Sequence, residues 1–142
     1  MQSLPSLEGV TKAEKRLKGL IRVTPLEFSK RLSNITNSSI LLKREDVQQI
    51  RSFKIRGAYN KISSLDEKEF KNGIICASAG NHAQGFAFSC KKLKINGEVY
   101  MPATTPQQKI TQVRMFGGDS IDIKLVGDTY DACQIVALNA AK

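Results

Sequence analysis

The chain has 142 residues, of which 41% are hydrophobic and 25% are charged, and its formal net charge is +9. This composition is ordinary for a globular protein and sufficient for one hydrophobic core. No apolar run approaches the ~20 residues of a membrane span, and the N-terminus lacks the apolar run of a signal peptide. We therefore expect a cytoplasmic protein that does not enter a membrane.

The positive charge is scattered from Lys12 to Lys142, mostly in ones and twos. A nucleic-acid surface would gather basic and aromatic residues in one stripe, so we expect no nucleic-acid partner. Anionic small molecules, or an acidic partner segment, explain the charge better.

The three cysteines are odd in number and far apart, and the chain has one histidine, His82. These residues offer neither a disulfide framework nor metal-ligand spacing. Cys76 and Cys90 lie in apolar stretches, which indicates buried free thiols. We expect no metal site.

In chain order, the first expected element is a helix. Thr11 and Glu14 have capping-box spacing, and Pro25 follows the helical pattern and ends it. The apolar run at 40–42 favours a short buried strand. A second helix begins near Ser52 and has one apolar face, formed by Ile55, Ala58, Tyr59 and Ile62.

From Gly73 onward, strands and helices alternate. The apolar run at 74–77 predicts a strand covered on both faces. A turn of small residues at 78–81 leads into a helix that runs to about Leu93, and the strand at 99–101 follows it.

Thr105 is expected to cap the next helix, with Pro106 in its first position and a glycine pair at 117–118 as its end. Polar and apolar residues then alternate over 121–125, which is typical of an edge strand. A last helix follows Thr129. This alternation predicts an α/β fold with a parallel sheet.

The last helix stops at Lys142 without a C-cap glycine or a following strand. We therefore expect the chain to be the N-terminal piece of a longer protein.

One candidate functional segment is Arg-Ser-Phe-Lys-Ile-Arg-Gly-Ala at 51–58. Lys54 would lie in the first turn of a helix, where the helix dipole disfavours a cation. The apolar neighbours Phe53 and Ile55 and the nearby arginines also favour the neutral amine, which is the form that makes a Schiff base. The plain alternative is a solvated surface lysine.

A second candidate segment is Ser-Ala-Gly-Asn-His-Ala-Gln-Gly at 78–85. It follows a strand and opens a helix, so its backbone N–H groups can bind an anion. Asn81 adds a side-chain donor, and Gly80 and Gly85 allow a ligand or a neighbouring backbone to approach closely. The plain alternative is an ordinary strand-to-helix turn in which His82 is a capping or core residue.

Both segments, together with Lys-Arg-Glu-Asp at 43–46, closely resemble the threonine dehydratases of the tryptophan-synthase-β-like class of pyridoxal-phosphate enzymes. The stretches 101–106 and 127–131 continue the resemblance, which runs from about Thr11 to the last residue. The fold it implies is a two-domain fold. Residues 1–48 would begin the larger domain, with its first helix and strand, and residues 49–142 would form the smaller parallel-sheet domain.

The resemblance also implies roles for individual residues. Lys54 would carry pyridoxal phosphate and remove the substrate α-proton, Phe53 would line the cofactor ring, and Asn81 would hydrogen-bond the ring's phenolic oxygen. The substrate carboxylate would lie on the turn formed by Ser78, Ala79, Gly80, Asn81 and His82. Racemases of the wider family carry a serine where this chain has Ala79, so elimination is favoured over racemisation.

The implied reaction converts threonine to 2-oxobutanoate and ammonia, the entry step to isoleucine. Family members bind the cofactor phosphate with a glycine-rich loop that would lie beyond residue 142. Serine as substrate, a catabolic role, and an inactive remnant that only binds anions stay open as alternatives. We expect the full-length protein to be a homo-oligomer, and the 142-residue chain alone to be inactive and to self-associate.

Overall fold

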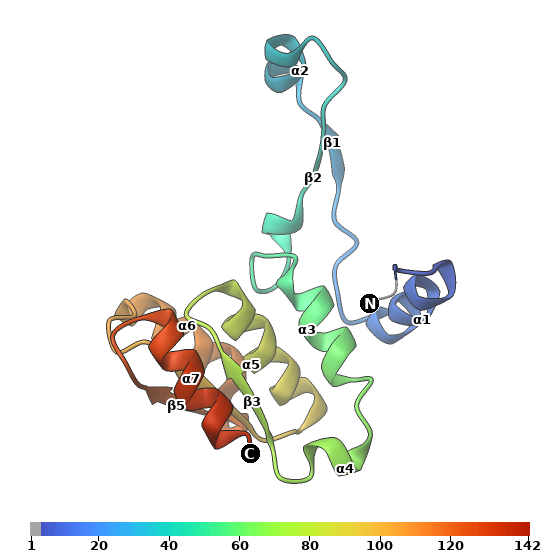
Figure 1. Ribbon diagram of the computed structural model, residues 1–142. Helices are drawn as coiled ribbons and strands as arrows, with labels where there is room; N and C mark the ends of the chain where they lie inside the picture. The colour runs from blue at the N-terminus through green and yellow to red at the C-terminus, as the bar shows by residue number, and fades with distance from the viewer. Residues whose placement is uncertain (1–3) are drawn as a thin grey trace.

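The computed structural model describes residues 4–142, in which a projecting arm joins a compact α/β unit (Figure 1). The chain starts with helix α1 (Leu7–Leu17), passes through the arm, and returns to the compact unit at helix α3 (Lys54–Ile62). Helix α1 packs against α3, where Leu17 is buried and the Arg16 guanidinium donates to the Asn60 side chain over 3.1 Å.

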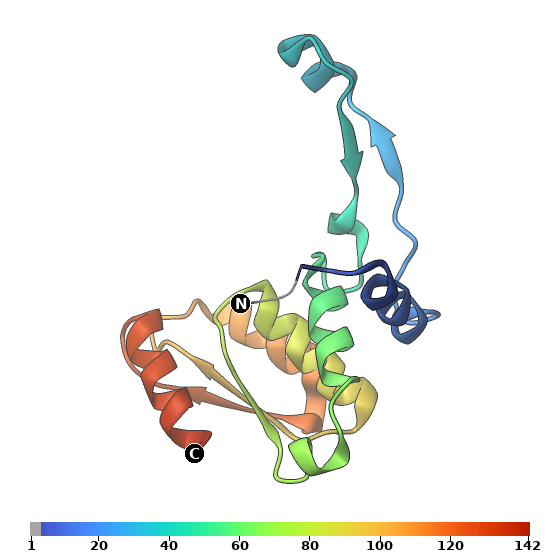
Figure 2. The same cartoon turned by 45° about the vertical axis from the view of Figure 1, so that its right-hand side comes forward.

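The compact unit is built on a parallel three-stranded sheet. Its strands, β3 (Ile74–Ala77), β4 (Gly97–Met101) and β5 (Ile121–Leu125), lie in the order β3-β4-β5. The helices α5 (Asn81–Leu93) and α6 (Gln107–Gly117) cover one face, and α7 (Tyr130–Ala140) covers the other (Figure 2). The predicted parallel sheet is confirmed.

Strand β3 has cover on both faces, as the sequence predicted. Cys76 belongs to the main core between the sheet and α5, whereas Ile75 and Ala77 pack on the opposite face against Cys133 of α7. Strand β5 is an edge strand, as its alternating residues indicated. The short helix α4 (Glu67–Phe70) precedes β3, and a 3-10 turn (Gly118–Ser120) joins α6 to β5.

The arm is an antiparallel pair of strands, β1 (Leu26–Phe28) and β2 (Leu41–Lys43), with helix α2 (Lys30–Thr36) at its tip. The expected buried strand at 40–42 is therefore wrong in its burial, because Leu41 and Leu42 are exposed. The apolar run gave the extended conformation correctly. The arm projects away from the sheet in both ribbon views, so no element among residues 4–142 covers it.

Two predicted helix starts are wrong in detail. Helix α1 begins at Leu7 because the Ser6 side chain caps it, and the Thr11 hydroxyl instead donates to the Leu7 carbonyl within the helix. At α6, Pro106 has a non-helical ψ of 137° and takes the cap position itself. The Thr105 hydroxyl is buried and has no hydrogen-bond partner within the described residues.

The other predicted starts and ends agree with the structure. Helix α3 begins close to Ser52 and buries three of the four residues of its expected apolar face, Ile55, Ala58 and Ile62. Helix α5 ends at Leu93, α6 ends at the glycine pair, and Thr129 caps α7. The division between residues 48 and 49 stays a prediction.

Candidate active site

The turn after β3 lies at the carboxyl end of the sheet. The Ser78 N–H donates to the Tyr100 carbonyl, and the Gly80 N–H donates to the Ser78 hydroxyl at 3.3 Å. Helix α5 then begins at Asn81 with neither a side-chain cap nor an acidic residue in its first turn. Because the first N–H groups of a helix have no partner inside it, this end of α5 favours an anion.

The backbone N–H groups of this turn are therefore of two kinds. The N–H groups of Ser78 and Gly80 already have protein acceptors, whereas the start of α5 at Asn81 and His82 is open. Gly80 faces open space, since a Cβ built on it would meet nothing within 4 Å. The side chains of Asn81 and His82 are exposed. An anion at this turn would consequently be bound mainly by the first turn of α5.

Lys54 is the first residue of α3, which confirms its predicted position in the first turn of a helix. Its N–H donates to the buried Ser52 hydroxyl at 3.2 Å, which fixes the start of the helix. The Lys54 side chain is exposed, and its Nζ lies 5.2 Å from the centroid of the Phe53 ring. An amine and an exposed aromatic ring therefore lie side by side at the start of α3.

The two predicted segments come together in space through the packing of α3 on α5. Gly85, four residues after Asn81, lies directly against the Lys54 backbone, because a Cβ on Gly85 would be 3.1 Å from the Lys54 carbonyl oxygen. Although His82 is exposed to solvent, partial desolvation of its ring lowers its pKa, and the nearby positive charge of Lys54 lowers it further. The sequence predicted both segments, and the structure brings the two helices that carry them into contact.

The motif at 43–46 has a structural role that its sequence did not reveal. Glu45 accepts from the Arg56 guanidinium at 2.7 and 2.8 Å and from the Thr24 hydroxyl at 2.6 Å. The hydrogen bond to Arg56 is the main reason that the pKa of Glu45 falls to about 2, against the opposing effect of burial. This paired charge ties the chain before α3 to the first turn of α3, two residues after Lys54.

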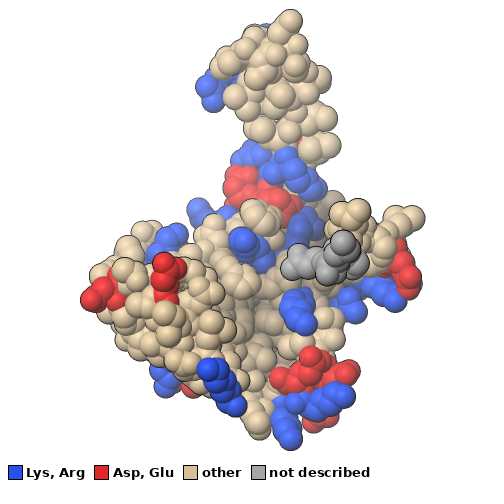
Figure 3. Space-filling view, viewed as in Figure 1, with Lys and Arg blue, Asp and Glu red and all other residues tan. Residues whose placement is uncertain are grey.

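Arg44 and Gln48 extend this network on either side of Glu45. Arg44 pairs with Glu27 and Asp46, which raises the pKa of Arg44, and oppositely charged side chains gather where the arm meets the compact unit (Figure 3). Gln48 is buried and exchanges two hydrogen bonds with the Arg22 backbone. The only signal of this network in the sequence was the pair of basic residues followed directly by a pair of acidic residues at 43–46.

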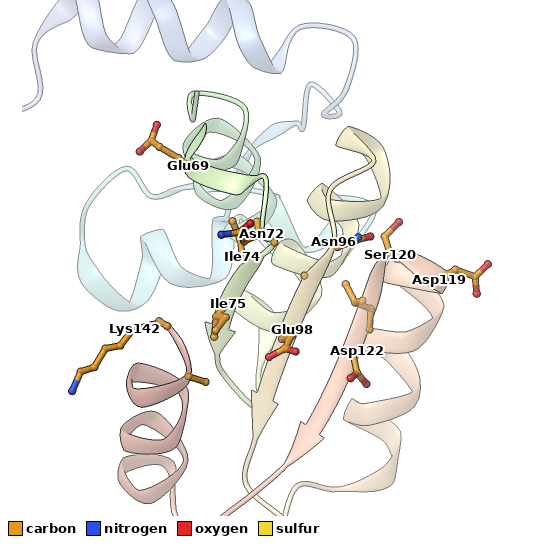
Figure 4. A pocket seen from close by; sticks show the side chains of 15 residues that line it. Glu69, Asn72, Ile74, Ile75, Asn96, Glu98, Asp119, Ser120, Asp122 and Lys142 are labelled. Carbon is orange, nitrogen blue, oxygen red and sulfur yellow. The ribbon is translucent and has the colours of Figure 1, made fainter. Parts of the chain in front are cut away.

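A cavity of the compact unit lies elsewhere, at the amino ends of the three strands (Figure 4). It measures about 740 Å³, and four carboxylate residues line it, Glu69, Glu98, Asp119 and Asp122. None of the candidate residues at 53–54 or 78–82 lines it. Its acidic lining disfavours an anionic ligand.

Metal and thiol chemistry receive no support from the described part of the chain. Residues 4–142 contain no group of three or more His, Cys, Asp or Glu side chains that could hold a metal ion. Cys76, Cys90 and Cys133 are free and buried, as predicted for the first two. Burial raises the pKa of Cys76 and Cys90 to about 12, so these thiols stay protonated. Within the same residues, no helix is long and apolar enough to cross a membrane.

The chain belongs to the family of pyridoxal-phosphate dependent enzymes, whose sequence profile matches residues 17–142. It is 51% identical over 137 residues to the biosynthetic L-threonine dehydratase of Staphylococcus epidermidis, and 52% identical over 129 residues to that of Bacillus subtilis. These alignments cover 96% and 91% of this chain but 32% and 31% of the two relatives. The chain thus spans about a third of the length of the curated relatives it matches.

Solved structures agree on the fold. The processed form of threonine deaminase isoform 2 from Solanum lycopersicum matches with a TM-score of 0.82 at 41% identity, over 93% of this chain and 38% of that chain. Maize serine racemase matches with a TM-score of 0.86 at 26% identity, over 96% of this chain and 41% of that chain. The tryptophan-synthase-β-like α/β fold class is confirmed.

Pyridoxal phosphate is the cofactor of this family, and the residues at the carboxyl end of the sheet fit it. The cofactor is an anionic aromatic aldehyde. The site offers a lysine amine, an aromatic ring beside it, an exposed side-chain amide at Asn81, and a helix start without acidic residues. The amine suits the cofactor aldehyde, the Phe53 ring suits its aromatic face, and the Asn81 amide suits its phenolic oxygen, whereas four carboxylate residues line the cavity at the other end.

Proposed function

We propose that the whole protein containing this chain dehydrates and deaminates threonine to 2-oxobutanoate and ammonia, as the first step of isoleucine biosynthesis. The observation that carries this proposal is the contact between Lys54 and the helix that begins at Asn81, in a chain about half identical to biosynthetic threonine dehydratases. Residues 49–142 would be the smaller domain, and residues 1–48 would begin the larger one.

In this proposal Lys54 holds the cofactor through its amine and later removes the substrate α-proton. Pyridoxal phosphate, when bound, supplies the electron sink for the carbanion at the substrate α-carbon. Phe53 places an aromatic face against the cofactor ring, and the Asn81 amide donates a hydrogen bond to the ring's phenolic oxygen.

The turn at 78–82 would orient the substrate by its carboxylate. The open N–H groups at Asn81 and His82 are the donors best placed for it, while Ser78 and Gly80 shape the turn through their own hydrogen bonds. Ala79 packs against the core and carries no hydroxyl that could return a proton to the opposite face. The turn therefore supports elimination, in which the β-hydroxyl leaves as water.

The proposal extends to the location and the assembly of the whole protein. We expect a cytoplasmic homo-oligomer without nucleic-acid or membrane partners, whose cofactor phosphate is bound by residues outside this chain. The arm supports contact with further protein, because Leu26, Phe28 and Ile35 are between 59% and 69% exposed and suit burial. The 142-residue chain alone would then self-associate and show no turnover.

Borohydride reduction in the presence of pyridoxal phosphate, followed by peptide mapping, tests the cofactor site of the whole protein. The pyridoxyl group should be found on Lys54, and a label confined to other lysines would contradict the proposal. Production of 2-oxo acid from threonine and from serine is measured in parallel. A higher kcat/KM for serine would assign the serine reaction instead, and no product from either would favour an inactive anion-binding remnant.

A further inference from the structure

Gly85 lies where the lysine helix and the turn helix approach each other most closely. It is buried in α5, four residues after Asn81, and its Cα faces the first turn of α3. A Cβ at this position would lie 3.1 Å from the Lys54 carbonyl oxygen, 3.2 Å from the Lys54 carbonyl carbon and 3.3 Å from the Ala58 Cβ. Most of this contact is with backbone, which cannot rotate out of the way as a side chain can.

The first turn of α3 is also held by polar contacts outside α5. Arg56 makes its two short hydrogen bonds to Glu45, whose side chain is only 16% exposed. The Lys54 N–H is bound to the Ser52 hydroxyl. Moving Lys54 away from α5 would stretch these bonds, and charge-assisted pairs of this geometry are about twice as strong as neutral ones.

We infer that Gly85 is a positioning residue for Lys54. Its missing side chain sets the separation between the lysine amine and the Asn81 turn. The inference rests on the proposed function of Lys54 as the cofactor lysine. A methyl group at Gly85 would displace the Lys54 backbone by a few tenths of an ångström, because the Glu45–Arg56 pair resists a larger movement. A displacement of 1 Å at a reacting group can cost about a hundredfold in rate.

Gly57 provides a matched control within the same pair of helices. It lies in α3, three residues after Lys54, and a Cβ there would meet nothing within 4 Å. Neither glycine has a backbone conformation that excludes alanine. Both substitutions also gain helix propensity, about 0.5–1 kcal/mol on replacing glycine by alanine. Gly85→Ala and Gly57→Ala therefore differ mainly in the contact with Lys54.

The test follows Lys54 itself in the whole protein. Each variant is mixed with pyridoxal phosphate and reduced with borohydride at a series of times, and the rate of pyridoxyl labelling at Lys54 is measured by mass spectrometry. Labelling of Lys91, on the opposite end of α5, is the internal reference. Gly85→Ala should lower the Lys54 rate about four- to tenfold relative to Lys91, whereas Gly57→Ala should leave the ratio at the wild-type value.

A second readout does not depend on the cofactor. The NMR chemical shift of the Lys54 amide should change in Gly85→Ala and stay constant in Gly57→Ala. If Gly85→Ala does not fold, Gly85→Ala combined with Ala58→Gly is measured in its place, since the second change removes the side-chain contact and keeps the backbone one. Wild-type labelling and an unchanged Lys54 amide in a folded Gly85 variant would overturn the inference. Absence of label on Lys54 in the wild type would instead overturn the proposed function, and the amide shift would still test the geometry.

Discussion

The two ends of the same three-stranded sheet carry opposite chemistry. At the carboxyl end, Lys54 and the open start of α5 face a turn that contains no acidic side chain. At the amino end, the cavity of about 740 Å³ is lined by four carboxylate residues and one lysine, Lys142 (Figure 4). The end that suits an anionic cofactor is therefore the one without the large cavity.

The difference follows from the topology of the sheet. Parallel strands connected by helices bring the positive start of each helix to the carboxyl end and its negative end to the other. The acidic side chains at the amino end add to that negative potential, and the lysine helix adds to the positive one. The sign of the local potential, and not the volume of the space, identifies the site that can bind an anion.

The largest expected effect concerns the lysine at each end. Lys54→Ala in the whole protein should reduce turnover of threonine by at least the 10² to 10⁴-fold that a positioned acid–base group typically contributes, because the amine both holds the cofactor and moves the proton. Lys142→Ala, at the acidic cavity, should leave kcat/KM within about twofold of wild type, as expected for an exposed surface residue. Equal losses of turnover from the two substitutions would contradict the functional difference between the two ends of the sheet.

The next largest effect should fall on stability, at the amino end. A Cβ on Gly97 would lie 2.7 Å from the Cys90 sulfur and within 3 Å of the Phe86 ring. Gly97→Ala should therefore lower the unfolding free energy by about 1–3 kcal/mol, the usual cost of overpacking a core. Urea denaturation measures the loss, with Gly57→Ala as the control that should show none. Pyridoxyl labelling of Lys54 per folded molecule should stay at the wild-type level, and a fall would mean that the amino end also shapes the site.

The sequence predicted the compact unit much better than the arm. Residues 73–142 alternate clear strand and helix patterns, and these elements pack in the two hydrophobic clusters on the two faces of the sheet, so local pattern and tertiary packing agree. At 40–42 the pattern predicted the strand correctly but its burial wrongly, since an apolar run does not specify which element covers it. The predicted capping residues Thr11 and Thr105 are wrong, because Ser6 caps α1 and Pro106 takes the cap position of α6.

In the candidate site, the sequence likewise predicted local segments but not the contacts between them. Lys54 and the Asn81 turn were predicted because each lies next to a recognisable helix start. Their contact through Gly85 and the Glu45–Arg56 pair depend on residues 31 and 11 positions apart in sequence, respectively, and no local pattern encodes such distances. Only the fold could place them together.

A smaller effect should appear in the pH dependence of stability. The folded-state pKa of Glu45 is about 2, below its ordinary value of 4.5, so its contribution is present above about pH 4.5 and is lost as the pH falls toward 2. A shift of this size corresponds to at most about 3 kcal/mol. Screening reduces it to about 1–2 kcal/mol, since solvent reaches a third of the Arg56 side chain.

The measurement compares urea unfolding of the wild type and Glu45→Gln from pH 5 to pH 2. The wild type should lose more stability than the variant over this range, because only the wild type must protonate residue 45. Asp122→Asn, which removes an exposed ion pair with Lys124 at the amino end, should follow the wild-type pH curve. Parallel curves for the wild type and Glu45→Gln would show that the Glu45–Arg56 pair does not hold the lysine helix.

The smallest effect concerns a single hydrogen bond at the start of α5. Asn81 is exposed, and its side chain makes no hydrogen bond within residues 4–142, so its removal should leave the unfolding free energy within about 0.5 kcal/mol of wild type. Cofactor affinity should nevertheless fall about fivefold in Asn81→Ala, since a neutral hydrogen bond contributes on the order of 1 kcal/mol. Asn72→Ala makes the same change at the acidic cavity and should leave the affinity unchanged. Titration of each variant with pyridoxal phosphate, followed by visible absorbance, gives the two dissociation constants. Equal affinities in the two asparagine variants would exclude a cofactor contact at Asn81 and leave Lys54 as the only supported distinction between the two ends of the sheet.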